Sequence, residues 1–478
     1  MHCKAVFKAL ILSLVVFGCG YQKVVTTAID VIEGPIAFPG AEGFGKFTTG
    51  GRGGEVVIVS NLNDQGEGSL RKAVEKNGSH IIVFSVSGTI HLESPLNIKG
   101  NKTIAGQTAP GDGICIADHP VKINGDNVII RYLRFRMGDR YQNQGMVHGA
   151  GHDDALSATG RKNIIIDHCS ISWSTDEVFS VYNGDSTTLQ WNLISEPLNY
   201  SYHFESGSSD FQRHGYGGIW GGRHLSAHHN LIAHCVSRAP RFNGIRHIDS
   251  ELVDYRNNVI YNWEVNNVYG GEGGTYNIVN NYYRYGPATK KNVMYRIVNP
   301  GKLQSPVIPF GKYYVAGNYV DGSPEVTNNN ELGVHMGEGT ADDKKTSLQA
   351  RPFTIMDIRM QSAVDAYQDV LKNAGASLPV RDTLDARIIN DVKNRSGRII
   401  DVQGGLPHGT PYSQSASAWP MLKSTPAKAD ADKDGMPDEW EQANGLNPAD
   451  STDVKGNKLH SHYTNIEVYI NSLVPKSF

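Results

Sequence analysis

The sequence predicts an all-β protein whose chain coils into a parallel β-helix, and three observations support this class. Between about residues 80 and 320, short β-branched runs alternate with polar or Asn/Gly bends, without helical periodicity. Equivalent points in these runs recur at steps of 24 to 37 residues. Asparagine recurs just after the runs, where it tolerates a left-handed bend and can pair its amide with the next coil.

The predicted strands and repeat points are read directly from the chain. The strands include residues 79–84, 127–130, 163–166, 188–191, 252–255 and 277–279. The repeat points are Arg131, Asp167, Trp191, His228, Tyr255, Val279 and Val315, and the recurrent asparagines are Asn230, Asn257, Asn258, Asn280, Asn281 and Asn318. A basic coil of about two dozen residues, lengthened by loops on some turns, is typical of stacked repeats. A β-sandwich would instead show frequent hairpin dipeptides between strands, and few are present.

The N-terminus carries an export signal. Lys4 and Lys8 precede an apolar run, residues 9–17, that is too short to span a bilayer. The run ends in Val16-Phe17-Gly18-Cys19, which resembles a bacterial lipoprotein signal in which the cysteine is lipidated. Residues 1–19 are therefore predicted to be a lipoprotein signal peptide, with ordinary cleavage nearby as the alternative. We expect a cell-envelope lipoprotein, at the surface or in the periplasm, or a secreted protein.

Three regions are expected after the signal. Residues 20–340 form the β-helix, and residues 341–424 form a helix and loop extension that packs on it. This extension contains two helix-compatible stretches, residues 362–374 and 382–393. Residues 425–478 form a C-terminal segment that starts with an acidic loop and ends in an amphipathic stretch, residues 464–474.

The charge balance limits the partners. Charged residues make up 19% of the chain and the formal net charge is -3, so no basic field exists to bind nucleic acid or an anionic membrane. An acidic partner must be recognised locally. Membrane attachment is expected only through the lipid anchor, and the protein is expected to be a monomer.

The acidic loop, residues 430–441, fits an EF-hand-type calcium loop. Its acidic residues occupy positions 1, 3, 5, 9 and 12, and Gly435 occupies position 6, where the loop turns sharply. The predicted ligands are Asp430, Asp432, Asp434, Asp438 and Glu441. The alternative is a solvated charged face. Because nothing nearby suggests acid-base chemistry, we expect a structural role that clamps the C-terminal segment.

A second acidic group lies within the coil. Asp153 and Asp154 precede one predicted strand, and Asp176 and Glu177 precede another. If residues 164–171 and 178–182 lie on successive strands of one coil, these carboxylates converge, and convergent carboxylates favour a hard cation such as Ca²⁺.

Two arginines complement these acids. Arg238 and Arg241 flank a bend stiffened by Pro240. If the two arginines stand alone, they are a surface salt-bridge cluster. If they lie one or two coils from the acids, they complete a site for a uronate, in which calcium binds the carboxylate and arginine meets the proton or the neighbouring oxygens.

These residues resemble the pectate lyases of polysaccharide lyase family 1. The match runs from residues 37–45 through 66–71, 166–168 and 238–241 to about residue 320. The resemblance implies a right-handed parallel β-helix and Ca²⁺ bound between enzyme and substrate carboxylates. It also implies β-elimination of α-1,4-linked galacturonan (pectin or pectate), giving 4,5-unsaturated oligogalacturonates. The implied partner is this acidic plant polysaccharide.

The resemblance also assigns roles to residues. Arg238 matches the arginine that removes the C5 proton, and Asp154 and Asp176 match calcium ligands. The family's further acid falls on Ser180, so Glu177 or Asp153 is left to complete the calcium shell.

Two further departures concern substrate binding. The family's later arginine falls on Asn243, which is expected to contact substrate from that position, and Arg241 is left as the second guanidinium of the site and substrate clamp. The family's lysine has no counterpart between Lys162 and Lys290, so His214, Arg213 or Arg223 are its candidate replacements, and each of them fits a purely structural loop equally well.

Other polar residues are assigned structural roles. Asp167 and His168 are expected to form a hydrogen-bonded pair beside the site, rather than an acid-base dyad. Arg134 and Arg136, which share one face of a strand, are expected to be solvated or salt-bridged.

Three alternative functions stay open. A β-helix glycoside hydrolase would give saturated products and ignore a chelator. A pectin lyase would not need calcium, and the acidic residues Asp154 and Asp176 argue against this alternative. A non-catalytic carbohydrate-binding β-helix would account for the departures from the family pattern.

Overall fold

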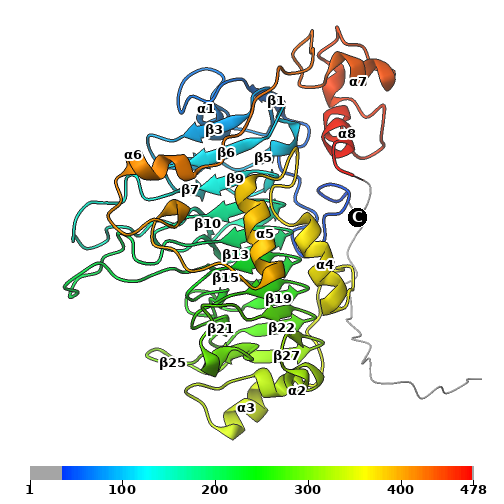
Figure 1. Ribbon diagram of the computed structural model, residues 1–478. Coiled ribbons are helices and arrows are strands. Elements are labelled where there is room, and N and C mark those ends of the chain that lie inside the picture. The colour runs from blue at the N-terminus through cyan, green and yellow to red at the C-terminus, as the bar shows by residue number, and fades with distance from the viewer. Residues whose placement is uncertain (1–34, 476–478) are drawn as a thin grey trace, which may run out of the picture.

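The computed structural model describes residues 35–475, and Figure 1 shows a tall coil with helices along one side. The predicted signal peptide lies outside the described residues. None of the helices within residues 35–475 is long and apolar enough to cross a bilayer.

Three parallel sheets run along the coil, and from β2 onward the chain visits them in the order I, II, III. Sheet I contains β1 (Glu55–Val59), β2 (His80–Phe84), β5 (Lys102–Ala105), β8 (Val128–Arg131), β11 (Lys162–Asp167), the second half of β13 (Phe179–Gln190), β16 (Leu225–His228), β19 (Leu252–Arg256), β22 (Thr275–Val279) and β27 (Lys312–Ala316). Sheet II contains β3 (Gly88–His91), β6 (Ile114–Ala117), β9 (Arg134–Arg136), β12 (Ser170–Ser172), β14 (Leu193–Ser195), β17 (Leu231–Ala233), β20 (Val259–Tyr261), β23 (Tyr282–Arg284) and β28 (Tyr319–Val320).

Sheet III contains β4 (Leu96–Ile98), β7 (Val121–Ile123), β10 (Leu156–Thr159), the first half of β13, β15 (Ile219–Gly222), β18 (Arg241–Phe242), β21 (Val268–Gly270) and β24 (Val298–Pro300). Only the small hairpin of β25 (Leu303–Gln304) and β26 (Val307–Ile308) is antiparallel among the described strand pairs. The predicted parallel β-helix is thereby confirmed, and right-handed connections are the rule between parallel strands.

The predicted repeat agrees closely with the register of sheet I. Its Cα partners run from Arg131 to Asp167, Gln190, His228, Arg256, Val279 and Ala316. Each expected repeat point lies at this register or one residue from it, because the β-branched runs end at the same corner of every coil.

The interior is a continuous apolar column built from the inward side chains of all three sheets. Phe242, Tyr276 and Tyr313 stack in its last coils, with ring centroids 4.6 and 4.8 Å apart. Each coil buries its apolar side chains against its neighbours, so the column depends on the rungs staying in register.

The corner between sheets I and II carries a ladder of buried asparagines, defined here as Asn192, Asn230, Asn258, Asn281, Asn318 and Asn330. From Asn230 onward, each Oδ1 accepts the backbone N–H of the preceding ladder asparagine at 2.8 to 3.0 Å, whereas Asn192 Oδ1 accepts the N–H of Cys169 at 2.9 Å. In the five coil members, Nδ2 donates to a strand carbonyl oxygen of the preceding coil. The ladder thus satisfies polar backbone groups that would otherwise be buried without partners.

The left-handed bend and the amide pairing belong to adjacent residues, which corrects the expectation that one asparagine does both. Asn257 and Asn280 have φ of 54°, and each precedes a ladder asparagine. His229 and Trp191 hold the equivalent position in earlier coils, with φ of 55° and 57°, and their rings stack 4.2 Å apart.

Helices α4 (Ala363–Asn373) and α5 (Thr383–Asn394) lie along the outer side of sheet II (Figure 1) and confirm the two predicted helical stretches. Arg134 and Arg136 were expected to be solvated or salt-bridged, and the structure shows the second: both are fully buried beneath α5 and paired with carboxylates. Asp382 and Asp385 of α5 pair with them; the Arg136–Asp385 contact is 2.9 Å and the Arg134–Asp382 contact is 3.0 Å. The helix brings the counter-charges that the strand sequence alone could not reveal.

The remaining helices cover the ends and one flank of the coil. Helix α1 (Leu70–Glu75) packs on the first coil, whereas α2 (Pro324–Asn328), η3 (Asn330–Gly333) and α3 (Ala341–Ser347) follow the last strand. The short helices are η1 (Gly106–Thr108), η2 (Lys291–Val293), η4 (Gln403–Gly405), α6 (Tyr412–Ser415) and η5 (Ala416–Ala418). The C-terminal segment contains α7 (Asp438–Ala443), η6 (Asp453–Lys455) and α8 (Asn465–Ser472), which confirms its amphipathic stretch as a helix. The region boundaries at residues 340 and 424 stay predictions.

The ladder yields a stability prediction for Asn258→Ala. The change leaves the buried Asn230 N–H and Ala227 carbonyl oxygen without partners, so we expect a loss of about 2–5 kcal/mol in the free energy of unfolding. Urea unfolding followed by circular dichroism measures it. Asn124→Ala, at an exposed asparagine pair between two coils, is the control and should change stability by no more than about 0.5 kcal/mol. Equal losses in both variants would contradict the role of the ladder.

Candidate active site

The predicted site residues lie where chain segments leave sheet II and enter sheet III. Asp154 precedes β10, Glu177 precedes β13, Tyr216 precedes β15 and Arg238 precedes β18. Their backbones continue the ladder of sheet III: Ala155 N–H donates to the Glu177 carbonyl oxygen at 3.2 Å, and further bonds link residues 178 to 216 and 217 to 237. Four successive coils therefore place these residues in one row along the edge of sheet III.

Three carboxylates converge in this row. One oxygen each of Asp154, Asp176 and Glu177 lies within 4.8 Å of the others. Burial, and then the nearby Asp176 charge, raise the pKa of Asp154 well above its usual value. An all-oxygen set of this kind suits Ca²⁺, which stabilises such acids in their ionised form. The residues therefore fit the implied cation.

Arg238 closes the row on the side away from Asp154. Its guanidinium forms an ion pair with the buried Glu177 carboxylate and lies over the Tyr216 ring, 4.7 Å from its centroid. The side chain keeps partial exposure, 23%, so it can meet a ligand. Its backbone has a φ of 55°, in the left-handed region.

Histidines flank the acids on the other side. His214 Nε2 contacts Asp176 Oδ1 at 2.7 Å, and the His203 ring stacks on His214 at 3.8 Å. Burial acts to raise the pKa of Asp176, but the hydrogen bond and charge of His214 outweigh it and lower the pKa overall. His214, one predicted substitute for the family lysine, therefore contacts the acidic cluster directly.

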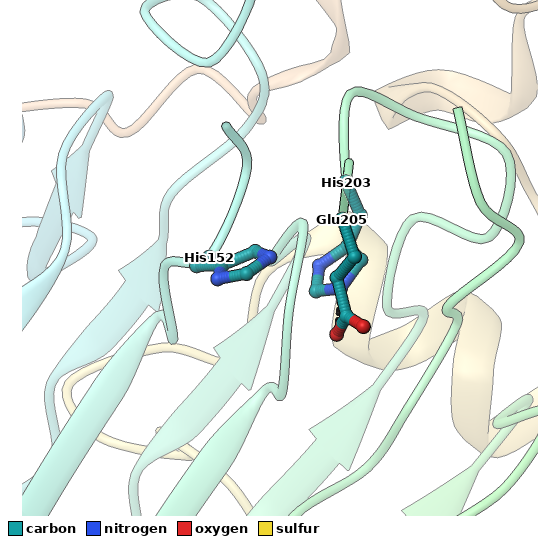
Figure 2. Close-up of side chains that lie close together, drawn as sticks. All are labelled: His152, His203 and Glu205. Atoms are coloured by element: carbon teal, nitrogen blue, oxygen red, sulfur yellow. Dashed lines mark ion pairs between the residues drawn. The ribbon is translucent and has the colours of Figure 1, made fainter. Parts of the chain in front are cut away.

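Figure 2 shows His152, His203 and Glu205 together on neighbouring loops. The two rings are stacked 4.4 Å apart, and His203 Nε2 lies 3.6 Å from Glu205 Oε1. Because the rings are nearly parallel, their in-plane lone pairs lie side by side and do not converge on one point. This group is thus a poorer cation site than the three carboxylates.

The other predicted substrate contacts lie apart from this row. Arg241 is buried, and its guanidinium pairs with Glu272 at 2.7 Å. Asn243 is buried and donates to Asn183 Oδ1 at 2.8 Å, whereas Arg213 is exposed with its guanidinium 5.1 Å from the Tyr200 ring centroid. Their roles as substrate contacts stay predictions.

Asp153 points toward residues that the sequence reasoning missed. Gln142 donates to its Oδ2 at 3.2 Å, and Lys122 Nζ lies 3.9 Å from its Oδ1. The resemblance placed the family's lysine between residues 162 and 290, where this chain has none. Lys122 lies earlier, on β7, and the pairing of β7 with β10 sets it beside Ser157. Only the register of sheet III could have identified it.

Asp167 and His168 lie at the end of a sheet I strand. Asp167 Oδ1 contacts His168 Nδ1 at 2.7 Å, and its Oδ2 accepts from Arg131 at 2.8 Å. Burial opposes ionisation of Asp167, but the charges of His168 and Arg131 keep its pKa far below the usual value. The predicted hydrogen-bonded pair is confirmed, and its structural role stays a prediction.

The C-terminal loop brings together most of its predicted ligands. Asp430, Asp432 and Asp434 converge within 4.8 Å, and so do Asp434, Glu441 and Asp453. Asp438 is not in either group; its Oδ1 accepts the N–H of Ala431 at 2.8 Å. Sequence spacing chose Asp438 because it occupies position 9, and missed Asp453, which is brought in by the fold.

Comparison with known proteins identifies the family. No protein-family profile matches the chain. Two proteins named "Probable pectate lyase C", from Aspergillus flavus and Aspergillus fumigatus, are 36% and 35% identical to it over 458 and 464 residues, covering 93% of this chain and 95% of each relative. A solved thermostable pectate lyase, PL 47, has a TM-score of 0.47 at 16% identity and covers 70% of this chain and 97% of its own. On the full-length relatives, the chain belongs to the pectate lyase family of polysaccharide lyases.

Proposed function

We propose that this pectate lyase cleaves α-1,4-linked galacturonan by calcium-dependent β-elimination, giving 4,5-unsaturated oligogalacturonates. The observation that carries the proposal is the carboxylate cluster of Asp154, Asp176 and Glu177, with Arg238 beside it, on the edge of sheet III. It combines an oxygen-only cation site with an adjacent guanidinium, which are the two groups that proton removal beside a uronate carboxylate requires.

Asp154, Asp176 and Glu177 would hold the cation, with Asp153 as a further acid nearby. When bound to a substrate carboxylate, Ca²⁺ supplies charge neutralisation that makes the neighbouring C5 proton more acidic and stabilises the developing anion. Ser180 stands where the family has an acid; it is buried, and its Oγ accepts the N–H of Ile219 at 3.2 Å. Glu177 is the residue that compensates for it in this proposal.

Arg238 is the proposed base. Free arginine is a poor base because its pKa exceeds about 12, so the site must disfavour the protonated form. Glu177 connects the two halves of the site: it pairs with Arg238 and also belongs to the carboxylate cluster. A cation held by Glu177 would weaken the counter-charge that Glu177 offers to Arg238.

Further substrate contacts are proposed around this row. Lys122 and His214 border the acids and can meet the oxygens of a neighbouring sugar. Arg241, Asn243 and Arg213 keep their predicted roles as substrate contacts. For Arg241 to contact substrate directly, its ion pair with Glu272 would have to open. Otherwise Arg241 would act indirectly, by holding the neighbouring backbone in place.

Export and anchoring are also proposals. The apolar run and Cys19 support export with an N-terminal lipid anchor. The relatives compared above are fungal, so the bacterial lipoprotein type is supported by residues 16–19 alone. A monomer is proposed as the working state.

The first prediction concerns metal dependence. Incubation with polygalacturonate and calcium should increase the near-ultraviolet absorbance of unsaturated uronate, and a chelator should abolish the increase because the carboxylate cluster loses its cation. Calcium in excess should restore it. Reducing ends released without new absorbance, unaffected by chelator, would instead establish a hydrolase, and unchanged polymer would establish a binding protein.

The second prediction concerns the base. Arg238→Lys keeps a positive charge but not the guanidinium, and we expect kcat to fall about 10²- to 10⁴-fold. Arg351→Lys, at an exposed arginine far along the chain, is the control and should retain wild-type kcat. Full activity in Arg238→Lys with a normal calcium requirement would rule out Arg238 as base.

The third prediction concerns the cation ligands. Asp154→Asn and Asp176→Asn preserve shape but remove charge, so the calcium concentration for half-maximal activity should rise at least about 10-fold. Calcium titrations of initial rate, at fixed polygalacturonate, measure this. Asp153→Asn should have a smaller effect because Asp153 faces Gln142 and Lys122. An unchanged calcium requirement in Asp154→Asn and Asp176→Asn would place the cation elsewhere.

A further inference from the structure

The C-terminal segment contains a second cluster of carboxylates, which the proposed function does not use. We call Asp430, Asp432, Asp434, Glu441 and Asp453 the C-terminal acid cluster. The first three come from the loop before α7, Glu441 from α7 itself, and Asp453 from the first residue of η6. Three separate pieces of backbone thus bring the acids into two adjoining groups that share Asp434.

The carboxylate oxygens fall into two kinds. One oxygen each of Asp432, Asp434 and Asp453 accepts a backbone N–H, from Asp434, Met436 and Asn447 respectively. The other oxygen of each, together with both oxygens of Glu441, is buried without a hydrogen-bond donor. The Glu441 residue is fully buried, at 0% exposure. The local backbone fixes the direction of each aspartate and leaves five oxygens facing inward.

No protein cation neutralises these acids within residues 35–475. The described ion pairs include none to a member of the cluster, and the neighbouring Lys433 is exposed. Buried carboxylates without a donor or counter-charge are strongly unfavourable, so they require a proton or a metal ion. Burial, and then the other acids, correspondingly raise the pKa of Glu441 to about 8.

We propose that the C-terminal acid cluster binds one Ca²⁺, with Asp453 as a ligand in place of the Asp438 that the loop spacing suggested. Five inward oxygens, two of them from one glutamate, match the six to eight oxygens that Ca²⁺ accepts, with solvent or Asp430 completing the shell. Mg²⁺ is a poorer fit, because it keeps several waters and prefers few carboxylates. Gly435 supplies the sharp turn of the loop with a φ of 94°.

The site ties the end of the chain to the first coils. Met436 and Val454, which neighbour ligands of the cluster, pack against Ile81 and Val83 on the outer face of sheet I. Arg52 adds an ion pair of 2.7 Å to Glu467 of α8. Figure 1 shows α7 and α8 beside β1 at this end of the coil. Bound calcium would therefore hold residues 430–453 in the shape that covers these strands.

Limited trypsin cleavage of the full chain, with calcium or with chelator, tests the proposal at a local readout. Lys455 and Lys458 are exposed beside the cluster, and Lys345 in α3 is a distant reference. At a calcium concentration 100 times the Kd, cleavage after Lys455 and Lys458 should slow about 100-fold, because the open segment is depopulated. Cleavage after Lys345 should not change.

Four variants test whether Asp453, or the Asp438 that the EF-hand-type spacing predicted, is a calcium ligand. Asp453→Asn and Glu441→Gln should lose the calcium protection, whereas Asp438→Asn and the surface control Glu439→Gln should keep it. Calcium titration calorimetry should count one fewer site in Asp453→Asn than in wild type, even if that variant loosens the segment. The proposal is overturned if calcium does not protect the wild type, if Asp453→Asn keeps both the protection and the site count, or if Asp438→Asn loses them.

Discussion

The register between successive coils is the constraint on which the rest of this structure depends. Backbone bonds within the three sheets set it, and the asparagine ladder fixes it at the corner between sheets I and II, where the chain would otherwise bury unpaired polar groups. Because every coil returns to the same corner, segments of unequal length leave and rejoin the stack without disturbing their neighbours. The row of Asp154, Glu177, Tyr216 and Arg238 exists because four such segments enter sheet III at equivalent points.

The charged groups of the candidate site pair with one another, and these pairs compete with the binding of a cation or a substrate. In the described chain Glu177 pairs with Arg238, and Asp176 pairs with His214, so the groups that would hold a cation and act on a sugar also neutralise one another. Such pairing keeps charges from being buried alone, at the cost of being rearranged when a ligand enters. In the proposed site, Ser180 stands where the resemblance implies an acid, and Glu177 would have both tasks.

Sequence reasoning was accurate where a periodic pattern determines the structure. The repeat points lie within one residue of the sheet I register. The two helices after the coil begin at Ala363 and Thr383, directly after the N-cap residues Ser362 and Asp382. Sequence reasoning was weaker where residues meet only through tertiary contacts. The sequence left open whether Arg134 and Arg136 are solvated or salt-bridged, because their partners Asp382 and Asp385 are about 250 positions away. Lys122 was missed because only lateral strand pairing brings it to Asp153. Asp453 was missed for the same reason.

The last step of the ladder has a consequence for the surface of the molecule. Asn318 donates its N–H to Asn330, which lies in η3 rather than in another strand, and Asn330 returns its own amide hydrogens to carbonyl oxygens of residues 318 and 326. If the last ladder asparagine had no partner, its free backbone N–H and side-chain amide could bond to a second chain, as exposed sheet edges do. Here a residue of the same chain imitates the next rung and satisfies those bonds internally. At this corner of the described chain, the last coil therefore leaves no unpaired asparagine bonds to which a second chain could add.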